Sequence, residues 1–121
     1  MRVLVVDAAN VVGARPDGWW KDRPGATRRL HESLLVADLP YDQIVVVLEG
    51  EAKAGVKAGR DHHVRVVHAP RDGDRTVVEE VTKAIGAGHQ VLAITSDRVL
   101  GARAANLGAR TMSAGWLLEH L

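Results

Sequence analysis

The sequence contains no cysteine and no phenylalanine, and only one tyrosine and three tryptophans among its 121 residues. Without cysteine the chain can form neither a disulfide nor a thiolate metal site, and this composition fits a reducing compartment. Because aromatic side chains are so few, the hydrophobic core has to be built from Val, Leu, Ile and Ala. The chain also lacks an excess of charge of one sign, since its formal net charge is +1. A nucleic acid would therefore have to bind a local basic patch.

Long hydrophobic runs are missing as well. No apolar run approaches the roughly 18 residues that are needed to span a bilayer. The apolar run at residues 3–6 lacks the basic start, the length and the small-residue cleavage site of a signal peptide. We therefore predict a cytoplasmic protein that does not enter a membrane. The length and the apolar share, which is almost half of the residues, predict a single globular domain over residues 1–121.

Short apolar segments alternate with helical patterns along the chain. Segments rich in β-branched residues and without polar alternation are typical of strands covered on both faces, as in a parallel sheet. The predicted strands are residues 2–7, 43–48, 64–68, 90–95 and a weaker fifth at 109–112. The predicted helices are residues 24–37, 75–85, 98–107 and a short last helix capped by Ser113. This alternation predicts an α/β fold, a three-layer α/β/α sandwich with right-handed crossovers.

Residues 50–61 are the exception to this alternation. They join two predicted strands through a Gly- and Lys-containing segment with only a weak helical pattern. We expect a mobile connection or a frayed helix there.

Acidic residues follow each of the first four predicted strands. Asp7 closes the first strand, Glu49 the second, Asp72 and Asp74 follow the third, and Asp97 follows the fourth. Open α/β sheets bind ligands at the carboxyl ends of their strands, so these side chains are expected at one edge. Each also has an ordinary interpretation: Asp97 or Ser96 could cap a helix, Asp74 could complement a helix dipole, and for Glu49 we favour an ordinary loop residue.

Taken together, the acidic residues predict a metal site. Several carboxylates at one edge repel one another unless a cation lies among them. Oxygen ligands without His or Cys suit Mg²⁺ or Mn²⁺. Such an ion can activate a water and neutralise the charge that develops on a phosphodiester, so hydrolysis of phosphodiesters is the natural reaction. Asp7, Asp74 and Asp97 are the predicted metal ligands.

The motifs around these aspartates resemble those of a known family. The Asp-x-x-Asn at residues 7–10, the Gly-Asp at 73–74 and the Thr-Ser-Asp-Arg at 95–98 resemble, in order and spacing, the acidic motifs of the NYN/YacP-like branch of the PIN-domain nucleases. The likeness extends across the chain to the Ser-x-x-Trp-Leu-Leu at 113–118. It implies a five-stranded parallel sheet in the order 3-2-1-4-5 and a Mg²⁺- or Mn²⁺-dependent ribonuclease, most naturally an endoribonuclease.

The resemblance also implies roles for two polar residues and contains one departure. Asn10 would orient a phosphate or a metal-bound water, and Ser96 would support the metal site. Relatives often carry a second acidic residue directly after the Gly-Asp pair, where this chain has Arg75. Arg75 could weaken the metal site or contact a substrate phosphate. The alternative function is therefore a catalytically inactive PIN-like module that binds RNA or a protein partner.

Basic and aromatic residues near the predicted site are candidates for contact with single-stranded or structured RNA. Trp19 and Trp20 follow the first strand and could stack on bases, although at least one of them is expected to anchor its loop in the core. Arg71, Arg75 and Arg98 flank the acidic motifs and could hold phosphates. An exposed edge strand is compatible with a homodimer.

Overall fold

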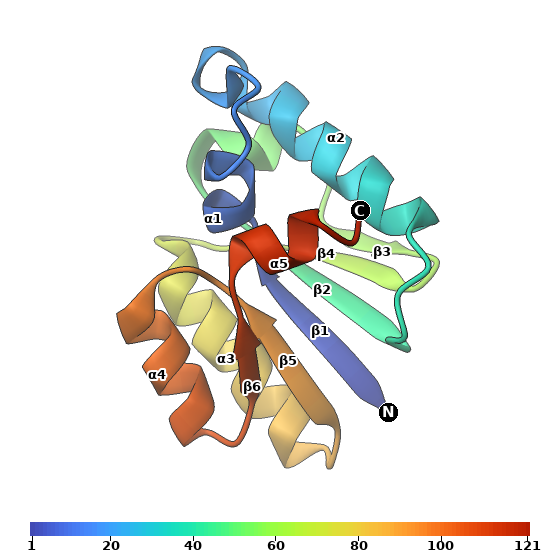
Figure 1. Cartoon of the computed structure of the whole chain (residues 1–121), viewed down its shortest axis with the longest axis vertical. Helices are drawn as coiled ribbons and strands as arrows, with labels where there is room; N and C mark the ends of the chain where they lie inside the picture. The colour runs from blue at the N-terminus through green and yellow to red at the C-terminus, as the bar shows by residue number, and fades with distance from the viewer.

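Six strands form one sheet in the order β3-β4-β2-β1-β5-β6 (Figure 1). The computed structural model describes the whole chain, residues 1–121. All neighbouring strands are parallel except β3, which is antiparallel to β4. The strands are β1 (Arg2–Asp7), β2 (Gln43–Leu48), β3 (Gly59–Asp61), β4 (Val64–His68), β5 (Gln90–Ile94) and β6 (Arg110–Met112).

Helices cover both faces of this sheet (Figure 1). The short helix α1 and the helices α2 and α5 pack on one face, and α3 and α4 pack on the other. None of the helices is long and apolar enough to cross a membrane. The helices are α1 (Ala8–Gly13), α2 (Arg23–Val36), α3 (Gly73–Gly86), α4 (Arg98–Asn106) and α5 (Ala114–Leu118), with two 3₁₀ turns, η1 (Trp19–Lys21) and η2 (Gly50–Ala54).

The central strand β1 is buried on both faces, which explains its unbroken apolar sequence. Leu4 and Val6 contribute to the core beneath α1, α2 and α5, whereas Val3 and Val5 contribute to the core beneath α3 and α4. Side chains alternate between the two faces of a strand, so both sets have to be apolar when helices cover both faces. Four consecutive residues of β1 therefore contribute alternately to the two hydrophobic cores on the two faces of the sheet.

The predicted strands and their order are confirmed, but the prediction of a five-stranded parallel sheet is wrong. A sixth strand, β3, extends the edge beside β4 and pairs Arg60 with Arg65. The two strands are joined by a tight turn in which His62 has a φ of 54°. All residues of β3 are exposed, so this strand carries no apolar pattern from which it could be recognised. Residues 50–61 thus contain η2 and β3 rather than a frayed helix.

Two helix starts differ from the prediction. The helix α1 follows β1 directly, where only a loop was expected, and its Val11 and Val12 are buried. The helix α3 begins at Gly73, earlier than predicted, because the side chain of Asp72 accepts a hydrogen bond from the Arg75 backbone N–H. The predicted cap of the last helix is confirmed, since the Ser113 side chain accepts a hydrogen bond from the backbone N–H of Trp116.

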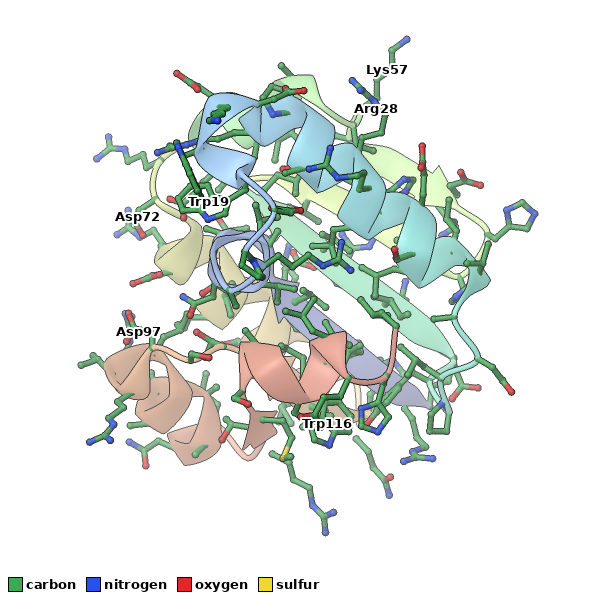
Figure 2. The ribbon with its side chains drawn as sticks, turned by 45° about the horizontal axis from the view of Figure 1, so that its top comes forward. Trp19, Arg28, Lys57, Asp72, Asp97 and Trp116 are labelled. Atoms are coloured by element: carbon green, nitrogen blue, oxygen red, sulfur yellow. The ribbon has the colours of Figure 1, made fainter.

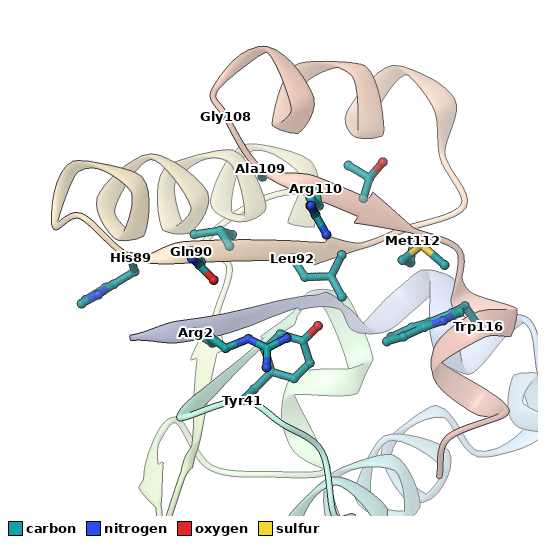
Figure 3. Close-up of a pocket in the computed structure, with 12 residues that line it drawn as sticks. Arg2, Tyr41, His89, Gln90, Leu92, Gly108, Ala109, Arg110, Met112 and Trp116 are labelled. Carbon is teal, nitrogen blue, oxygen red and sulfur yellow. The ribbon is translucent and has the colours of Figure 1, made fainter.

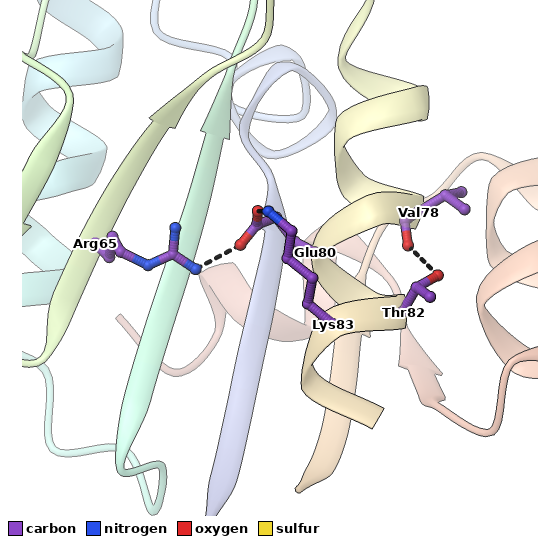
Figure 4. Close-up of polar contacts among 5 residues, drawn as sticks. All are labelled: Arg65, Val78, Glu80, Thr82 and Lys83. Atoms are coloured by element: carbon purple, nitrogen blue, oxygen red, sulfur yellow. Dashed lines mark hydrogen bonds and ion pairs between the residues drawn. The ribbon is translucent and has the colours of Figure 1, made fainter. Parts of the chain in front are cut away.

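A buried carboxylate fastens α3 to the sheet. Glu80 is only 5% exposed, and its Oε1 accepts a hydrogen bond from the guanidinium of Arg65 on β4 (Figure 4). The ammonium of Lys83 lies 3.4 Å from the other carboxylate oxygen. A buried charge is tolerated only when it is paired and hydrogen-bonded, so this contact holds the two elements in a fixed relation.

We expect Glu80→Ala to destabilise the protein by about 1–3 kcal/mol, because it removes the buried partner of Arg65 and leaves a small void. The exposed neighbour on the same helix provides a matched control, and Glu79→Ala should change the free energy of unfolding by less than about 0.5 kcal/mol. Urea unfolding of the three proteins measures both values. Equal effects of the two substitutions would contradict an anchoring role for Glu80.

Candidate functional site

The three predicted acidic motifs meet at the carboxyl ends of the central strands. Asp7 ends β1, and Asp97 follows the neighbouring strand β5, whose Ile94 is paired with Val6. Asp74 lies in the first turn of α3, after β4. Figure 2 shows Asp72 and Asp97 on the same side of the molecule. The topology therefore brings segments far apart in the sequence to one edge, as the order of the strands predicted.

Asp7 is the most deeply buried member of this group. It is 3% exposed, and its Oδ2 accepts hydrogen bonds from Thr95 Oγ1 and Asn10 Nδ2, each at 3.0 Å. Burial raises the pKa of the Asp7 carboxyl above its ordinary value, hydrogen bonds from Thr95 and Asn10 oppose the rise, and the charge of Asp74 adds to it. A carboxylate in this position is costly in the absence of a cation.

Asn10 and Thr95 connect the first motif to the third. Asn10 Oδ1 accepts a hydrogen bond from the Ser96 backbone N–H at 3.1 Å. Thr95 Oγ1 accepts one from the Asp97 backbone N–H, also at 3.1 Å. Both ends of the Asn10 amide are thus engaged within the protein, which makes Asn10 a bridge between the motifs. The role of Thr95 was not predicted, although Thr95 belongs to the Thr-Ser-Asp-Arg motif, because only the fold places its hydroxyl beside Asp7.

Ser96 faces the last helix rather than the carboxylates. Its Oγ accepts a hydrogen bond from the Ala114 backbone N–H at 3.0 Å, at the first residue of α5. This contact connects the C-terminal helix to the edge of the sheet that carries Asp7, Asp74 and Asp97 (the acidic edge). The side chain of Ser96 supports the site by fixing the turn that carries Asp97.

Asp97 caps the helix that follows it. Its Oδ1 accepts hydrogen bonds from the backbone N–H groups of Val99 and Leu100, at 2.9 and 3.0 Å. The capping interpretation of this residue is therefore confirmed. The two bonds use the same oxygen, and Oδ2 receives no hydrogen bond from the protein. Capping holds the carboxylate in a fixed orientation and leaves one oxygen for another ligand.

Glu49 lies in the loop after β2, beside Asp74, and makes a specific contact there. Its Oε2 accepts a hydrogen bond from the Gly73 backbone N–H at 2.9 Å, at the start of α3. A Cβ atom at position 73 would lie 3.2 Å from Glu49 Oε1, so glycine permits this close approach. The signal in the sequence was the combination of an acid after the second strand with a glycine before Asp74, which only the fold makes adjacent.

The pKa of Asp74 is affected by the acidic residues around it. Burial raises the pKa of the Asp74 carboxyl, and the negative charges of Asp97, Asp72 and Glu49 raise it further, while Arg103 opposes the rise. These acidic residues are therefore near enough to Asp74 to disfavour its ionised form. Like charges in such an arrangement favour the binding of a cation.

The donor chemistry fits a hard divalent ion, although the side chains do not enclose one in this conformation. No three carboxylate or imidazole groups converge closely enough to hold a metal. Asp97 is turned toward its own helix by its two capping bonds. The group offers only oxygen ligands, which suit Mg²⁺ and Mn²⁺. Asp7, Asp74 and Asp97 are the residues that could hold such an ion.

The predicted substrate residues differ in their surroundings. Trp19 is half-buried and packs against the core, with the guanidinium of Arg23 5.4 Å from its ring centroid, as expected for at least one of the two tryptophans. Trp20 is 60% exposed and lies edge-on to Trp19. The remaining candidates, Arg71, Arg75 and Arg98, are all exposed. Trp20 is therefore the tryptophan that is available to stack on a base.

The fold is shared with a known bacterial protein. The chain matches two crystal structures of Rae1 (YacP) from Bacillus subtilis. One of them, a mutant form, has a TM-score of 0.67 and 20% identity over 98% of this chain and 74% of that chain. The other has a TM-score of 0.61 and 22% identity over 98% and 72%. The chain has the fold of Rae1 (YacP).

The resemblance to YacP, first drawn from the three acidic motifs, is thereby confirmed at the level of the fold. No sequence-family model and no curated protein sequence matches the chain. At identities near 20% the likeness establishes the arrangement of the elements, and the roles of individual side chains have to be argued from this chain.

We expect Asp7→Asn to stabilise the metal-free protein at pH 7 by on the order of 1 kcal/mol, since it removes a buried charge while keeping a hydrogen-bond acceptor. The folded pKa of Asp7 lies above the ordinary value of 3.8, so the ionised form is the less favourable one in the folded state. As the pH falls through the folded pKa, the wild-type carboxyl takes up a proton and the advantage of the variant should shrink. Urea unfolding in EDTA at pH 7 and pH 5 measures this difference.

The matched control is Asp38→Asn, which changes an exposed carboxylate between α2 and β2. It should leave the free energy of unfolding nearly unchanged at both pH values. A loss of stability in Asp7→Asn at pH 7, or a gain that does not depend on pH, would contradict the account of Asp7 given above.

Proposed function

We propose that this protein is a metal-dependent ribonuclease that hydrolyses phosphodiester bonds of RNA at the acidic edge. A single-stranded RNA is the simplest substrate with which to measure this activity. The observation that carries the proposal is that Asp7, Asp74 and Asp97 come from three separate segments to the carboxyl edge of the central strands, where their oxygens suit a hard divalent ion. The fold shared with Rae1 (YacP) supports it, because the motif resemblance pointed to the same branch. We expect the enzyme to act in the cytoplasm.

The residues of the chain have distinct roles in this proposal. Mg²⁺ or Mn²⁺, when bound by Asp7, Asp74 and Asp97, supplies an activated water and neutralises charge on the phosphate. Thr95 and Asn10 donate hydrogen bonds to Oδ2 of the Asp7 carboxylate. These bonds fix the orientation of the carboxylate, so that its other oxygen can bind the metal. The capping bonds of Asp97 do the same for the opposite side of the site.

Substrate contacts come from the exposed groups around the acidic edge. Arg71, Arg75 and Arg98 are exposed and flank the motifs, so their guanidinium groups can pair with phosphate oxygens. Trp20 exposes a large aromatic surface on which a base can stack. In this proposal Arg75 contacts the substrate in place of the second carboxylate that relatives often have, and Trp19 positions the segment that carries Trp20.

A second candidate function is an inactive module that binds RNA. It is favoured by the cation at position 75, directly after Asp74. A positive charge there reduces the affinity of the neighbouring carboxylate for a divalent ion. The two candidates differ in one respect, which is whether metal-dependent cleavage occurs at this edge.

We expect the purified protein to cleave 5′-labelled single-stranded RNA in the presence of Mn²⁺ and to lose this activity in EDTA. Asp97→Asn and Asp74→Asn should each lower the rate by about 100-fold or more, because the loss of even an outer-shell partner of a metal costs about 10–100-fold. Resolution of the cleaved fragments on a denaturing gel measures the rate.

Asp38→Asn is again the control, since it removes an exposed carboxylate away from the motifs, and it should cleave at the wild-type rate. If Asp97→Asn cleaved as fast as the wild type, the activity would belong to a contaminant and the proposed function would be wrong. RNA binding by a wild-type protein that never cleaves would identify the inactive module instead.

A further inference from the structure

A wide groove of about 860 Å³ lies away from the acidic edge, on the face of the sheet that carries α1, α2 and α5 (Figure 3). Its floor is formed by β1, β5 and β6 where those helices leave the sheet uncovered. The residues that define it are Arg2, Tyr41, Leu92, Arg110, Met112 and Trp116.

The register of the sheet explains why these side chains share one face. Arg110 is paired with Leu92, and Met112 with Ile94, and both Leu92 and Ile94 belong to the core on this face. Alternate residues of a strand point to the same face, so Arg110 and Met112 point into the groove (Figure 3). Met112 is 38% exposed, which is unusual for an apolar side chain over a sheet. The groove is therefore a part of the sheet face without a helix above it.

The groove carries positive charge and no carboxylate among its lining residues. Arg2 and Arg110 contribute the permanent charges. His89, which directly precedes β5, also lines the groove. One carboxylate, that of Asp42, lies beside Arg2 outside the lining, where its Oδ2 accepts a hydrogen bond from the Arg2 backbone N–H at 2.8 Å. In a molecule with a net charge of only +1, this is a local basic surface that fits a polyanion.

Two aromatic rings line the same groove. The guanidinium of Arg2 lies 5.1 Å from the centroid of the Tyr41 ring. Trp116 is half-buried on α5, and its ring is tilted by 35° against that of His120, with the two ring centroids 4.4 Å apart. Arginines beside flat rings are the combination by which proteins hold single strands, since the cations pair with phosphates and the rings stack on bases.

We propose that this groove is a binding site for single-stranded RNA, separate from the acidic edge, in which Arg2 and Arg110 pair with phosphates and Tyr41 and Trp116 stack on bases. The helix α5 connects the two places, because its first residue, Ala114, is hydrogen-bonded to Ser96 and Trp116 lines the groove. A strand bound in the groove would thus lie next to the helix that borders the acidic edge. That such a strand is also the substrate of the acidic edge would rest on the proposed function.

Fluorescence anisotropy with a labelled 12-nucleotide single-stranded RNA in EDTA tests the groove without cleavage. The double variant Arg2→Ala/Arg110→Ala should bind more weakly, and its slope of log affinity against log salt should fall by about 1.4, or about 0.7 for each phosphate that is no longer neutralised. The control is Arg28→Ala/Lys57→Ala, which removes two exposed cations far from Trp116 (Figure 2). It should keep the wild-type affinity and slope. Met112→Glu, which adds a negative charge to the groove, should also weaken binding.

Unchanged affinity and slope in the groove variants would overturn the proposal. So would self-association that the double variant abolishes while RNA binding is kept, because the groove would then belong to a second copy of the chain. Melting temperatures equal to that of the wild type establish that the variants are folded. Cleavage is measured separately with Mn²⁺: a wild type that does not cleave, but whose binding depends on Arg2 and Arg110, would refute the proposed function and leave the groove proposal standing.

Discussion

The carboxylate of Asp7 is the constraint on which the rest of the site depends. It lies at the end of a central strand that is buried on both faces, where an ionised group is costly unless it is hydrogen-bonded or neutralised. The chain meets part of this cost with hydrogen bonds from Thr95 and Asn10. The remaining charge, together with that of Asp74, is what a divalent cation would balance. Burial thus leaves negative charge at this edge of the sheet that a positively charged ligand would neutralise.

The same hydrogen bonds organise the structure around the site. Asn10 joins the first motif to the turn of the third, Ser96 joins that turn to α5, and Glu49 holds the start of α3 beside Asp74. Because these contacts come from segments separated along the chain, the acidic edge can form only when the whole sheet is in register. The anchoring of α3 by Glu80 contributes to this register from farther along the helix. Stability and site geometry are therefore linked through α3.

The sequence was informative wherever the fold buries both faces of an element. The central strands could be predicted to within one residue because their Val and Ile runs admit no exposed face, and the carboxyl-edge rule then brought Asp7 and Asp97 together. It was uninformative where elements are exposed or where contacts join distant segments. The strand β3 has no buried residue, Glu49 acquires its role only through Gly73, and the groove forms only when the sheet places Arg2 and Arg110 on one face.

The central claim is that the acidic edge binds a divalent metal, and a crystal grown with Mn²⁺ tests it most directly. Anomalous scattering from manganese reveals the ion without reference to activity. We predict a peak bounded by the carboxylates of Asp7, Asp74 and Asp97, with the side chain of Asp74 moved toward the other two. A crystal in which manganese is absent from this edge, at a concentration that supports cleavage by metal-dependent nucleases, would contradict the account and favour a module that binds RNA without cutting it.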